Sequence, residues 1–178
     1  MLTNFDLEEM CRYYHVPLVT CTMKNELPVK IKDGNYIINL QSSTQGDGTH
    51  WTALIIRNDI ALYFDSFGAP SSTEIIDFVK KRKNIHLAFN NEIIQDLKSS
   101  NCGYYCLALI LYVKHHRSIP LVQSAENFTR LFADDTKKND GILRHFFKII
   151  STTGGNGGVT TPKPILKLMK QSKSTTQH

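Results

Sequence analysis

The chain has 178 residues, 41% of them apolar, which is enough for one domain with a full hydrophobic core. The formal charge of +5 by itself supports only weak, salt-sensitive binding to DNA or to an acidic partner. The chain contains neither an apolar run of about twenty residues nor a signal-peptide pattern, which argues against a membrane-spanning protein and against secretion by a recognisable signal.

The cysteines and histidines do not form a metal-binding pattern. The four cysteines, at positions 11, 21, 102 and 106, are too few and too dispersed for a disulfide scaffold, so we expect reduced thiols. No pair of CxxC or HxxxH type occurs. We therefore expect no metal and no cofactor.

The first fifty residues predict a short helix, a loop and a strand. Thr3 or Asn4 can cap a helix at the N-terminus, because apolar residues follow at helical spacing. Residues 21–34 contain Pro28 and a Lys-Asp-Gly turn signal, which predict an ordered loop. Residues 36–41, with the sequence YIINLQ, predict a buried strand.

The next segment predicts a β-hairpin followed by a helix. A turn-rich loop at 43–48 leads into the β-branched and apolar run THWTALIIR, and a tight turn at 57–59 leads into IALYFD. Residues 71–83 carry apolar positions at helical spacing and a basic last turn, so we expect an amphipathic surface helix capped by Ser71 or Ser72.

The rest of the first 150 residues predicts short strands and then helices. Residues 85–95 indicate further strands of the same sheet, and residues 102–115 a helix that is apolar on nearly every face and therefore central. Two more helices are expected within 118–135 and 139–150. The predicted class is α+β, with helices packed around a sheet that contains antiparallel strands.

The composition changes at residue 151. Glycine, threonine, proline and lysine dominate from there on, so we expect a domain at 1–150 and a flexible tail at 151–178. The segment TTGGNGGV at 152–159 contains two Gly-Gly pairs, which are either a plain linker or a site that a glycine-selective protease could cut in itself.

Cys102 is the first candidate for chemistry. A thiol in the first turn of a helix lies near the positive end of the helix dipole and near unpaired backbone N–H groups, which favour thiolate. Gly103 after it leaves room for another backbone or a substrate to approach, and the polar residues before it are expected to place the thiol where water and substrate can reach it. Cys106, one turn further along, has the surroundings of a core residue. Taken alone, a cysteine at a helix start is most often inert packing.

A nucleophilic cysteine needs a base, an orienting group and a donor to the oxyanion. His50 and Asp65 are fifteen residues apart at the open end of the predicted hairpin, where a carboxylate can hold an imidazole. Gln95 precedes Cys102 by seven residues, at the end of a predicted strand, and its amide can join the Cys102 backbone N–H as a donor. Each of these residues alone has a more ordinary explanation as a polar surface group.

Together, the motifs HW at 50–51, FDSFG at 64–68 and Gln95 with Cys102-Gly103 resemble the adenovirus-type and ubiquitin-like-protein-specific cysteine proteases, clan CE. The resemblance covers about residues 40–115 and is closest to the capsid-maturation proteases of viruses and virophages. It implies a papain-like fold of the adenain and SUMO-protease type, with a central sheet flanked by helices and the nucleophile at the N-terminus of a buried helix.

The resemblance also implies a role for each matched residue. Cys102 is then the nucleophile, His50 the general base and acid, Asp65 the group that orients His50, and Gln95 the oxyanion donor. Trp51 would help to form a narrow channel for small substrate residues, which implies cleavage after Gly-Gly-type sequences. Some members of the family carry Glu where this chain has Asp65, and either carboxylate can orient an imidazole.

Several functions remain open at the level of sequence. The favoured one is a monomeric endopeptidase that cleaves capsid precursors, acts in the host cytoplasm or virus factory and is packaged in the virion. Alternatives are a deconjugase of ubiquitin-like modifiers, an acyltransferase with the same triad order, and an inactive protease fold that binds DNA or capsid. A DNA or peptide activator is a further option, although no residue clearly matches the cysteine that links the adenovirus enzyme to its peptide cofactor.

Overall fold

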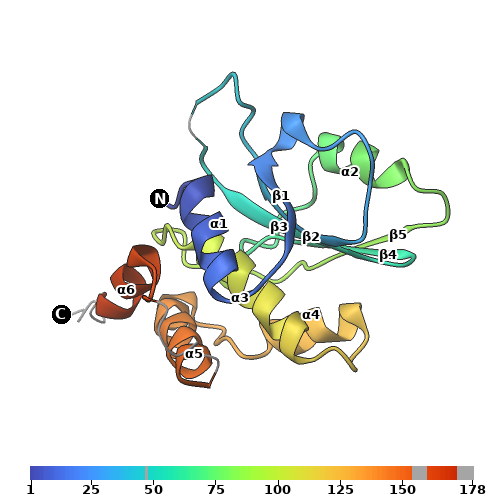
Figure 1. Cartoon of the computed structure of the whole chain (residues 1–178). Coiled ribbons are helices and arrows are strands. Elements are labelled where there is room, and N and C mark those ends of the chain that lie inside the picture. The colour runs from blue at the N-terminus through green and yellow to red at the C-terminus, as the bar shows by residue number, and fades with distance from the viewer. Residues whose placement is uncertain (47, 154–159, 172–178) are drawn as a thin grey trace.

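A computed structural model of the chain describes residues 1–46, 48–153 and 160–171. Its centre is one mixed sheet with the strands in chain order: β1 (Leu18–Met23), β2 (Gly34–Asn39), β3 (Trp51–Arg57), β4 (Ile60–Phe64) and β5 (His86–Phe89) (Figure 1). The inner three strands pair antiparallel, whereas β1 and β5 pair parallel to their neighbours at the two edges. The predicted hairpin of β3 and β4 is therefore confirmed.

Helices cover both faces of the sheet. One face packs against α2 (Thr73–Lys80). The other packs against a group of helices: α1 (Asn4–Tyr13), α3 (Cys102–His115), α4 (Leu121–Thr129), α5 (Asn139–Thr153) and α6 (Lys163–Lys170) (Figure 1). Two 3₁₀ turns, at Lys24–Glu26 and Thr136–Lys138, complete the described elements. The α+β class and the central sheet flanked by helices are thus as expected.

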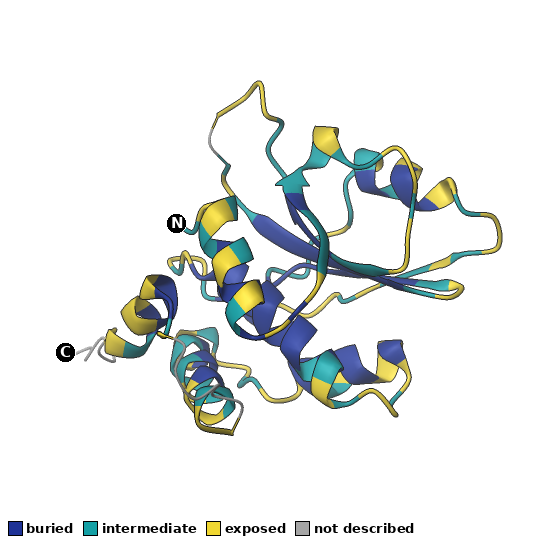
Figure 2. Cartoon of the chain, in the orientation of Figure 1, coloured by how far each residue is buried: buried dark blue, intermediate teal, exposed yellow. Residues whose placement is uncertain are grey.

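The inner strands are apolar on both sides because both sides are covered. Along β3, Ala53 and Ile55 face the α3 side, while Leu54 and Ile56 face α2. Successive side chains of a strand point to opposite faces, so a strand between two helical layers has no polar face. The same reasoning explains why α3, which lies between the sheet and the outer helices, is buried along nearly its whole length (Figure 2).

Two strand assignments made from the sequence are wrong. Residues 18–23, partly assigned to the loop 21–34, form the edge strand β1, whose half-exposed side chains give little hydrophobic signal. Only His86–Phe89 of the region 85–95 is a strand. After it the Asn90 side chain bonds both main-chain groups of Asp65, and the backbone N–H groups of Ile94 and Gln95 donate to the Ser66 carbonyl. Gln95 therefore lies in a loop rather than at a strand end.

The helix ends show which capping predictions hold. At α1, Thr3 accepts a hydrogen bond from the Asp6 backbone N–H and the Asp6 carboxylate accepts one from the Thr3 backbone N–H, which is a capping box. Ser72 occupies the cap position of α2, but its side chain makes no capping hydrogen bond. α3 begins at Cys102, as predicted.

The C-terminal region holds more structure than the expected tail. α5 continues to Thr153, and α6 packs Ile165 and Leu168 into the main core with no exposed surface. The Tyr104 hydroxyl of α3 donates to the Pro164 carbonyl of α6 at 2.8 Å. Most of the Gly-rich segment proposed for self-processing, residues 154–159, lies outside the described residues, as does 172–178. Within the described ranges, no helix is both long and apolar enough to cross a membrane.

An aromatic cluster between α4 and the sheet allows a test of this packing. The Phe128 ring is fully buried, and its centroid lies 5.2 to 6.3 Å from those of four other aromatic rings, Phe64, Tyr112, Phe132 and Phe146. We expect Phe128→Ala to lower the free energy of unfolding by about 3–5 kcal/mol, because it leaves a cavity among rigid rings. Denaturant unfolding followed by circular dichroism measures this loss.

Phe5→Ala is the matched control. Phe5 is 73% exposed on α1, so its truncation should change the free energy of unfolding by no more than about 0.5 kcal/mol. Equal losses for the two variants would contradict the packing described here.

Candidate active site

The open end of the β3–β4 hairpin brings His50 and Asp65 together. His50 directly precedes β3 and Asp65 directly follows β4, and antiparallel pairing places them side by side. His50 Nε2 lies 2.9 Å from Asp65 Oδ1, and the Asp65 side chain is 1% exposed. A carboxylate can only accept, so the proton of this bond belongs to Nε2. The ring nitrogen left for other chemistry is Nδ1.

Phe67 further restrains the orientation of the Asp65 carboxylate and of the His50 ring. Its backbone N–H donates to Asp65 Oδ1 at 2.7 Å, and its ring stacks on the His50 imidazole with centroids 4.9 Å apart. The carboxylate is thus anchored by the main chain, and the imidazole is held against an aromatic face. The sequence motif FDSFG contains Phe67, but sequence reasoning assigned no role to it.

The surroundings of His50 favour its charged form. Burial opposes protonation, but hydrogen bonding and charge interactions with Asp65 and Cys102 outweigh it and raise the pKa of His50 to about 9. Cys102 is therefore among the groups that influence the protonation of the imidazole. His50, Asp65 and Cys102 form one cluster, although they come from three separate parts of the chain.

Cys102 is held against the start of β3. The backbone N–H of Trp51 donates to Cys102 Sγ at 3.4 Å, and one turn along the helix Cys106 Sγ donates to the Trp51 carbonyl at 3.3 Å. Burial, followed by the electrostatic interaction with Cys102, raises the pKa of Cys106 well above its ordinary value, so this thiol keeps its proton. Cys106 is a core residue, as expected, and it also bonds the carbonyl of Trp51, the residue whose N–H faces Cys102.

Trp51 is enclosed by the protein itself. It is 2% exposed, and its indole N–H donates to the Leu2 carbonyl at 2.9 Å. A Cβ atom on Gly103 would lie 3.1 Å from Leu2 Cδ1 and Leu7 Cδ2. The space beside Gly103, expected from the sequence to admit substrate, is therefore filled by these side chains. Trp51 and Leu2 form a wall next to Cys102.

Gln95 is buried and tightly oriented. Ser66 Oγ donates to Gln95 Oε1 at 2.6 Å, which fixes the orientation of the amide group because Oε1 only accepts. Gln95 Nε2 donates to the Ser99 carbonyl at 2.8 Å, and its second N–H has no partner among the described residues. Gln95 can therefore offer one N–H to a ligand. Ser66, which sequence reasoning missed, sets the direction of that N–H.

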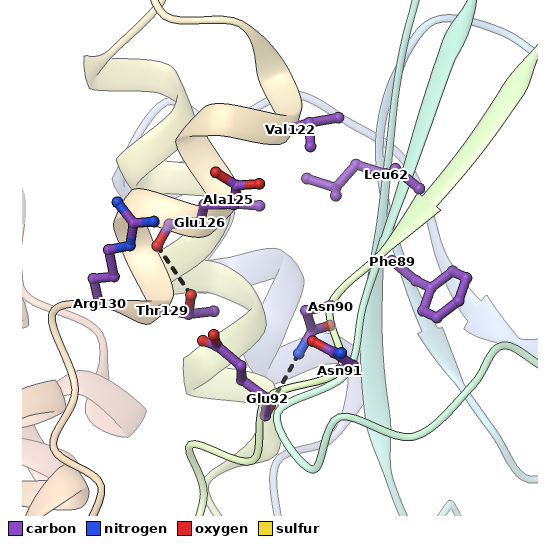
Figure 3. Close-up of a pocket in the computed structure, with 11 residues that line it drawn as sticks. Leu62, Phe89, Asn90, Asn91, Glu92, Val122, Ala125, Glu126, Thr129 and Arg130 are labelled. Atoms are coloured by element: carbon purple, nitrogen blue, oxygen red, sulfur yellow. Dashed lines mark hydrogen bonds between the residues drawn. The ribbon is translucent and has the colours of Figure 1, made fainter.

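Two cavities lie outside the cluster of His50, Asp65 and Cys102. A cavity of about 350 Å³ adjoins Cys102 through Ser100 and Asn101, and α1 and α6 form its other walls. A second cavity of about 270 Å³ lies between α4 and the end of β5, where Leu62 and Val122 face one another (Figure 3). The described residues contain no group of three His, Cys, Asp or Glu side chains arranged to hold a metal ion.

Comparisons with known proteins agree with this fold. No family model and no curated protein matches the chain. The solved structure "AvrA delL154 with IP6, CoA" aligns with a TM-score of 0.50 and 15% identity, over 90% of this chain and 72% of that one. Two structures of the ASFV pS273R protease, one of them the selenomethionine form, align with TM-scores of 0.44 and 0.49 and identities of 16% and 17%, over 74% of this chain. The chain spans 65% and 66% of the length of those two.

At these identities the similarity concerns the fold. The chain shares its α+β fold with the AvrA structure, and within this fold it has a central five-stranded sheet and places Cys102 at the N-terminus of α3. The roles of the individual site residues rest on the geometry described above and on the sequence motifs.

The elevated pKa of His50 gives a direct test of its pairing with Asp65. Its folded-state pKa of about 9 exceeds the ordinary value of 6.5, so protonation of His50 stabilises the fold fully below pH 6.5, and this contribution is lost as the pH rises through 9. We expect Asp65→Asn to lower the pKa of His50 by at least about one unit, because the carboxylate charge is lost. NMR titration of the imidazole measures the shift.

Asp77→Asn is the matched control for this charge change, since Asp77 lies on α2, on the opposite face of the sheet. It should leave the His50 titration unchanged. A His50 pKa that stays the same in Asp65→Asn would contradict the pairing.

Asn90 allows a second test of the position of Asp65, because its side chain bonds the main chain of Asp65. Its side chain donates to the Asp65 carbonyl at 2.7 Å and accepts from the Asp65 N–H at 2.9 Å. We expect Asn90→Ala to cost about 1–3 kcal/mol of unfolding free energy, because it leaves partly buried main-chain groups unpaired. The His50 pKa should also fall as Asp65 loses its position. Exposed Asn91 is the control, and Asn91→Ala should change neither quantity.

Proposed function

We propose that the protein is a cysteine endopeptidase that cleaves after small, Gly-Gly-type residues and processes viral capsid precursors during virion maturation. The observation that carries the proposal is the position of His50, whose Nε2 bonds buried Asp65 while Cys102 contributes to its raised pKa. An imidazolium oriented by a carboxylate and paired with a cysteine at a helix start is the arrangement that activates a thiol nucleophile.

The proposed reaction begins with acylation. The Cys102 thiolate attacks the scissile carbonyl carbon, and the resulting oxyanion accepts hydrogen bonds from the Cys102 backbone N–H and the free N–H of Gln95. His50 then gives its Nδ1 proton to the leaving amine as the C–N bond breaks, which leaves a thioester on Cys102. The charge on Asp65 stabilises the imidazolium before this step.

Deacylation reverses the roles of the same groups. Neutral His50 takes a proton from a water molecule, and the hydroxide attacks the thioester carbonyl. The C–S bond breaks, the carboxylic acid product leaves, and Cys102 returns as a thiolate beside protonated His50.

The preference for small residues is supported by the enclosure of the site. Cys102 and Trp51 are each 2% exposed, and the His50 side chain is 15% exposed. A substrate with large side chains next to the scissile bond would meet Trp51 and Leu2 before its carbonyl reached the sulfur. Glycines present only backbone and can approach more closely.

Two other enzymatic activities fit the same triad. A deconjugase would cleave after the Gly-Gly terminus of a folded ubiquitin-like modifier. An acyltransferase would pass the acyl group of the thioester to an amine instead of water. The AvrA structure, solved with IP6 and CoA, is the observation that favours this alternative. The non-enzymatic alternative, an inactive fold that binds DNA or capsid, has less support because all four proposed catalytic positions carry suitable groups.

An assay with three substrates separates these activities. Wild-type protein is given a Gly-Gly peptide, a ubiquitin-like fusion with a cleavable C-terminal extension, and acetyl-CoA with an acceptor lysine peptide. We expect cleavage of the Gly-Gly peptide, and we expect Cys102→Ala and His50→Ala to reduce it at least about a thousandfold, since the members of a triad act as a unit.

The other outcomes discriminate between the alternatives. Cleavage of the fusion alone indicates a deconjugase, and acetylation alone indicates an acyltransferase. Incubation with capsid precursors from the same genome, with Cys102→Ala as the control, then maps new termini. We propose that this processing takes place in the host cytoplasm or virus factory by a monomer packaged in the virion, and adding DNA or peptides to the assay tests for an activator.

A further inference from the structure

Asp140 is a carboxylate that joins three donors around the start of α3. It lies in the first turn of α5, and its two oxygens accept hydrogen bonds from Ser99 Oγ at 3.0 Å, Asn101 Nδ2 at 2.9 Å and the Tyr105 hydroxyl at 3.1 Å. These three residues lie on both sides of Cys102. The carboxylate therefore spans the segment from which the nucleophile projects.

The Tyr105 bond places part of this network in the core. Tyr105 is fully buried, and burial, followed by the charge of Asp140, raises the pKa of its hydroxyl. The hydroxyl remains a donor to Asp140 at all ordinary pH values. The Tyr105 end of this hydrogen bond is thus shielded from water, while Asp140 itself is partly exposed, and a bond to a charged acceptor is stronger than one between neutral groups.

Ser99 connects Asp140 to the proposed oxyanion donor. Its carbonyl accepts from Gln95 Nε2 at 2.8 Å, while its hydroxyl donates to Asp140. The Asn101 backbone N–H in turn donates to Ser99 Oγ at 3.3 Å. Because the Gln95 amide is held by Ser66 at one end and by Ser99 at the other, a shift of Ser99 would rotate the amide and its free N–H.

The neighbouring residue secures the other end of the same loop. Asn139, fully buried, donates from Nδ2 to the carbonyls of Ile94 and Ala133, each at 2.9 Å. The start of α5 therefore holds both ends of the loop 94–101 by hydrogen bonds. Asn139 holds the residue before Gln95, and Asp140 holds Ser99 and Asn101, which shortly precede Cys102.

We infer that Asp140 is a positioning residue for the oxyanion hole: through Ser99 and Asn101 it sets the direction of the Gln95 N–H and of the Cys102 backbone N–H. The inference rests on the proposed acyl-transfer chemistry of Cys102. Asp140 acts through these residues and takes no part in bond making itself. No sequence motif pointed to it.

The experiment compares the rate constants of two reactions of Cys102, one that passes through an oxyanion and one that does not. With p-nitrophenyl acetate, Cys102 sulfur bonds to the acetyl carbon, the ester C–O bond breaks, and p-nitrophenolate leaves, which reports acylation through an oxyanion. With iodoacetamide, the same sulfur displaces iodide from a CH₂ carbon and forms no oxyanion. Peptide mapping by mass spectrometry assigns both products to Cys102, with Cys102→Ala as the background.

We expect Asp140→Ala to lower the acylation rate constant about tenfold or more, a part of the roughly hundredfold effect of losing one oxyanion donor. The rate constant for alkylation should stay within about twofold of wild type. In a Gln95→Ala background, Asp140→Ala should lower acylation by a smaller factor than it does in the wild-type background, since one of the two donors through which it acts is already absent.

Two further variants sharpen the comparison. Asp140→Asn keeps an acceptor for Ser99 and Tyr105, and the Asn101 amide can rotate to offer its oxygen, so acylation should recover to within about threefold of wild type. Asp134→Ala removes an exposed carboxylate near the start of α5 and should change neither rate. Denaturant unfolding of each variant shows that the rates refer to folded protein.

The possible results distinguish failure of the inference about Asp140 from failure of the proposed protease function. Equal losses of acylation and alkylation in Asp140→Ala, or additive effects with Gln95→Ala, would show that Asp140 only supports the fold and would overturn the inference. Wild-type acylation at Cys102 without cleavage of any peptide would overturn the proposed protease function while the test of Asp140 still stands. Absence of acylation in the wild type would overturn both.

Discussion

The main-chain N–H and carbonyl of Trp51, each hydrogen-bonded to a cysteine sulfur, join the helical layer of this molecule to its sheet. The N–H donates to Cys102 and the carbonyl accepts from Cys106, so the first turn of α3 is attached to the first residue of β3. His50 immediately precedes this residue. The distance between the proposed nucleophile and base therefore follows from one main-chain contact between helix and sheet, and the spacing of the two cysteines by one helical turn has a structural reason.

Two consecutive residues after β4 organise the rest of the site. The Asp65 carboxylate holds His50, while the Ser66 hydroxyl and carbonyl hold the side chain and backbone of Gln95. The orienting group and the proposed oxyanion donor are thus linked through one peptide bond. Asn90 bonds the main chain of Asp65 from the other side, which keeps this short segment from shifting when charge moves through His50.

How far the sequence predicts this arrangement depends on how local each feature is. The β3–β4 hairpin, α3 and the proximity of His50 to Asp65 follow from strand pairing across a short turn and from hydrophobic pattern, so they were predictable. The edge strand β1 was missed because its side chains are only half buried. Gln95 was assigned to a strand because IIQ is apolar and β-branched, whereas hydrogen bonds to Asp65 and Ser66 pull this segment out of the sheet.

The contacts made by Asp140 could not be inferred from pattern at all. It meets Ser99 across 41 positions of the chain and Tyr105 across 35, and an aspartate followed by glycine at a helix start reads as an ordinary first turn. The same limit applies to α6, whose Ile165 and Leu168 become core residues only because α1, α3 and α5 provide a surface for them.

The hydrogen bonds around Gln95 bear on how the proposed site would work. Its oxygen and one N–H are already bonded, so the remaining N–H has a fixed direction before any substrate arrives. A donor fixed in advance costs no reorganisation when negative charge develops, which is where most electrostatic catalysis originates. The nearly complete burial of Cys102 and Trp51 works in the same direction, because it excludes water that would compete for the oxyanion. In the proposed mechanism, the narrow approach for the substrate and the strength of the oxyanion hole would thus have the same structural origin, the close packing of the start of α3 against the hairpin.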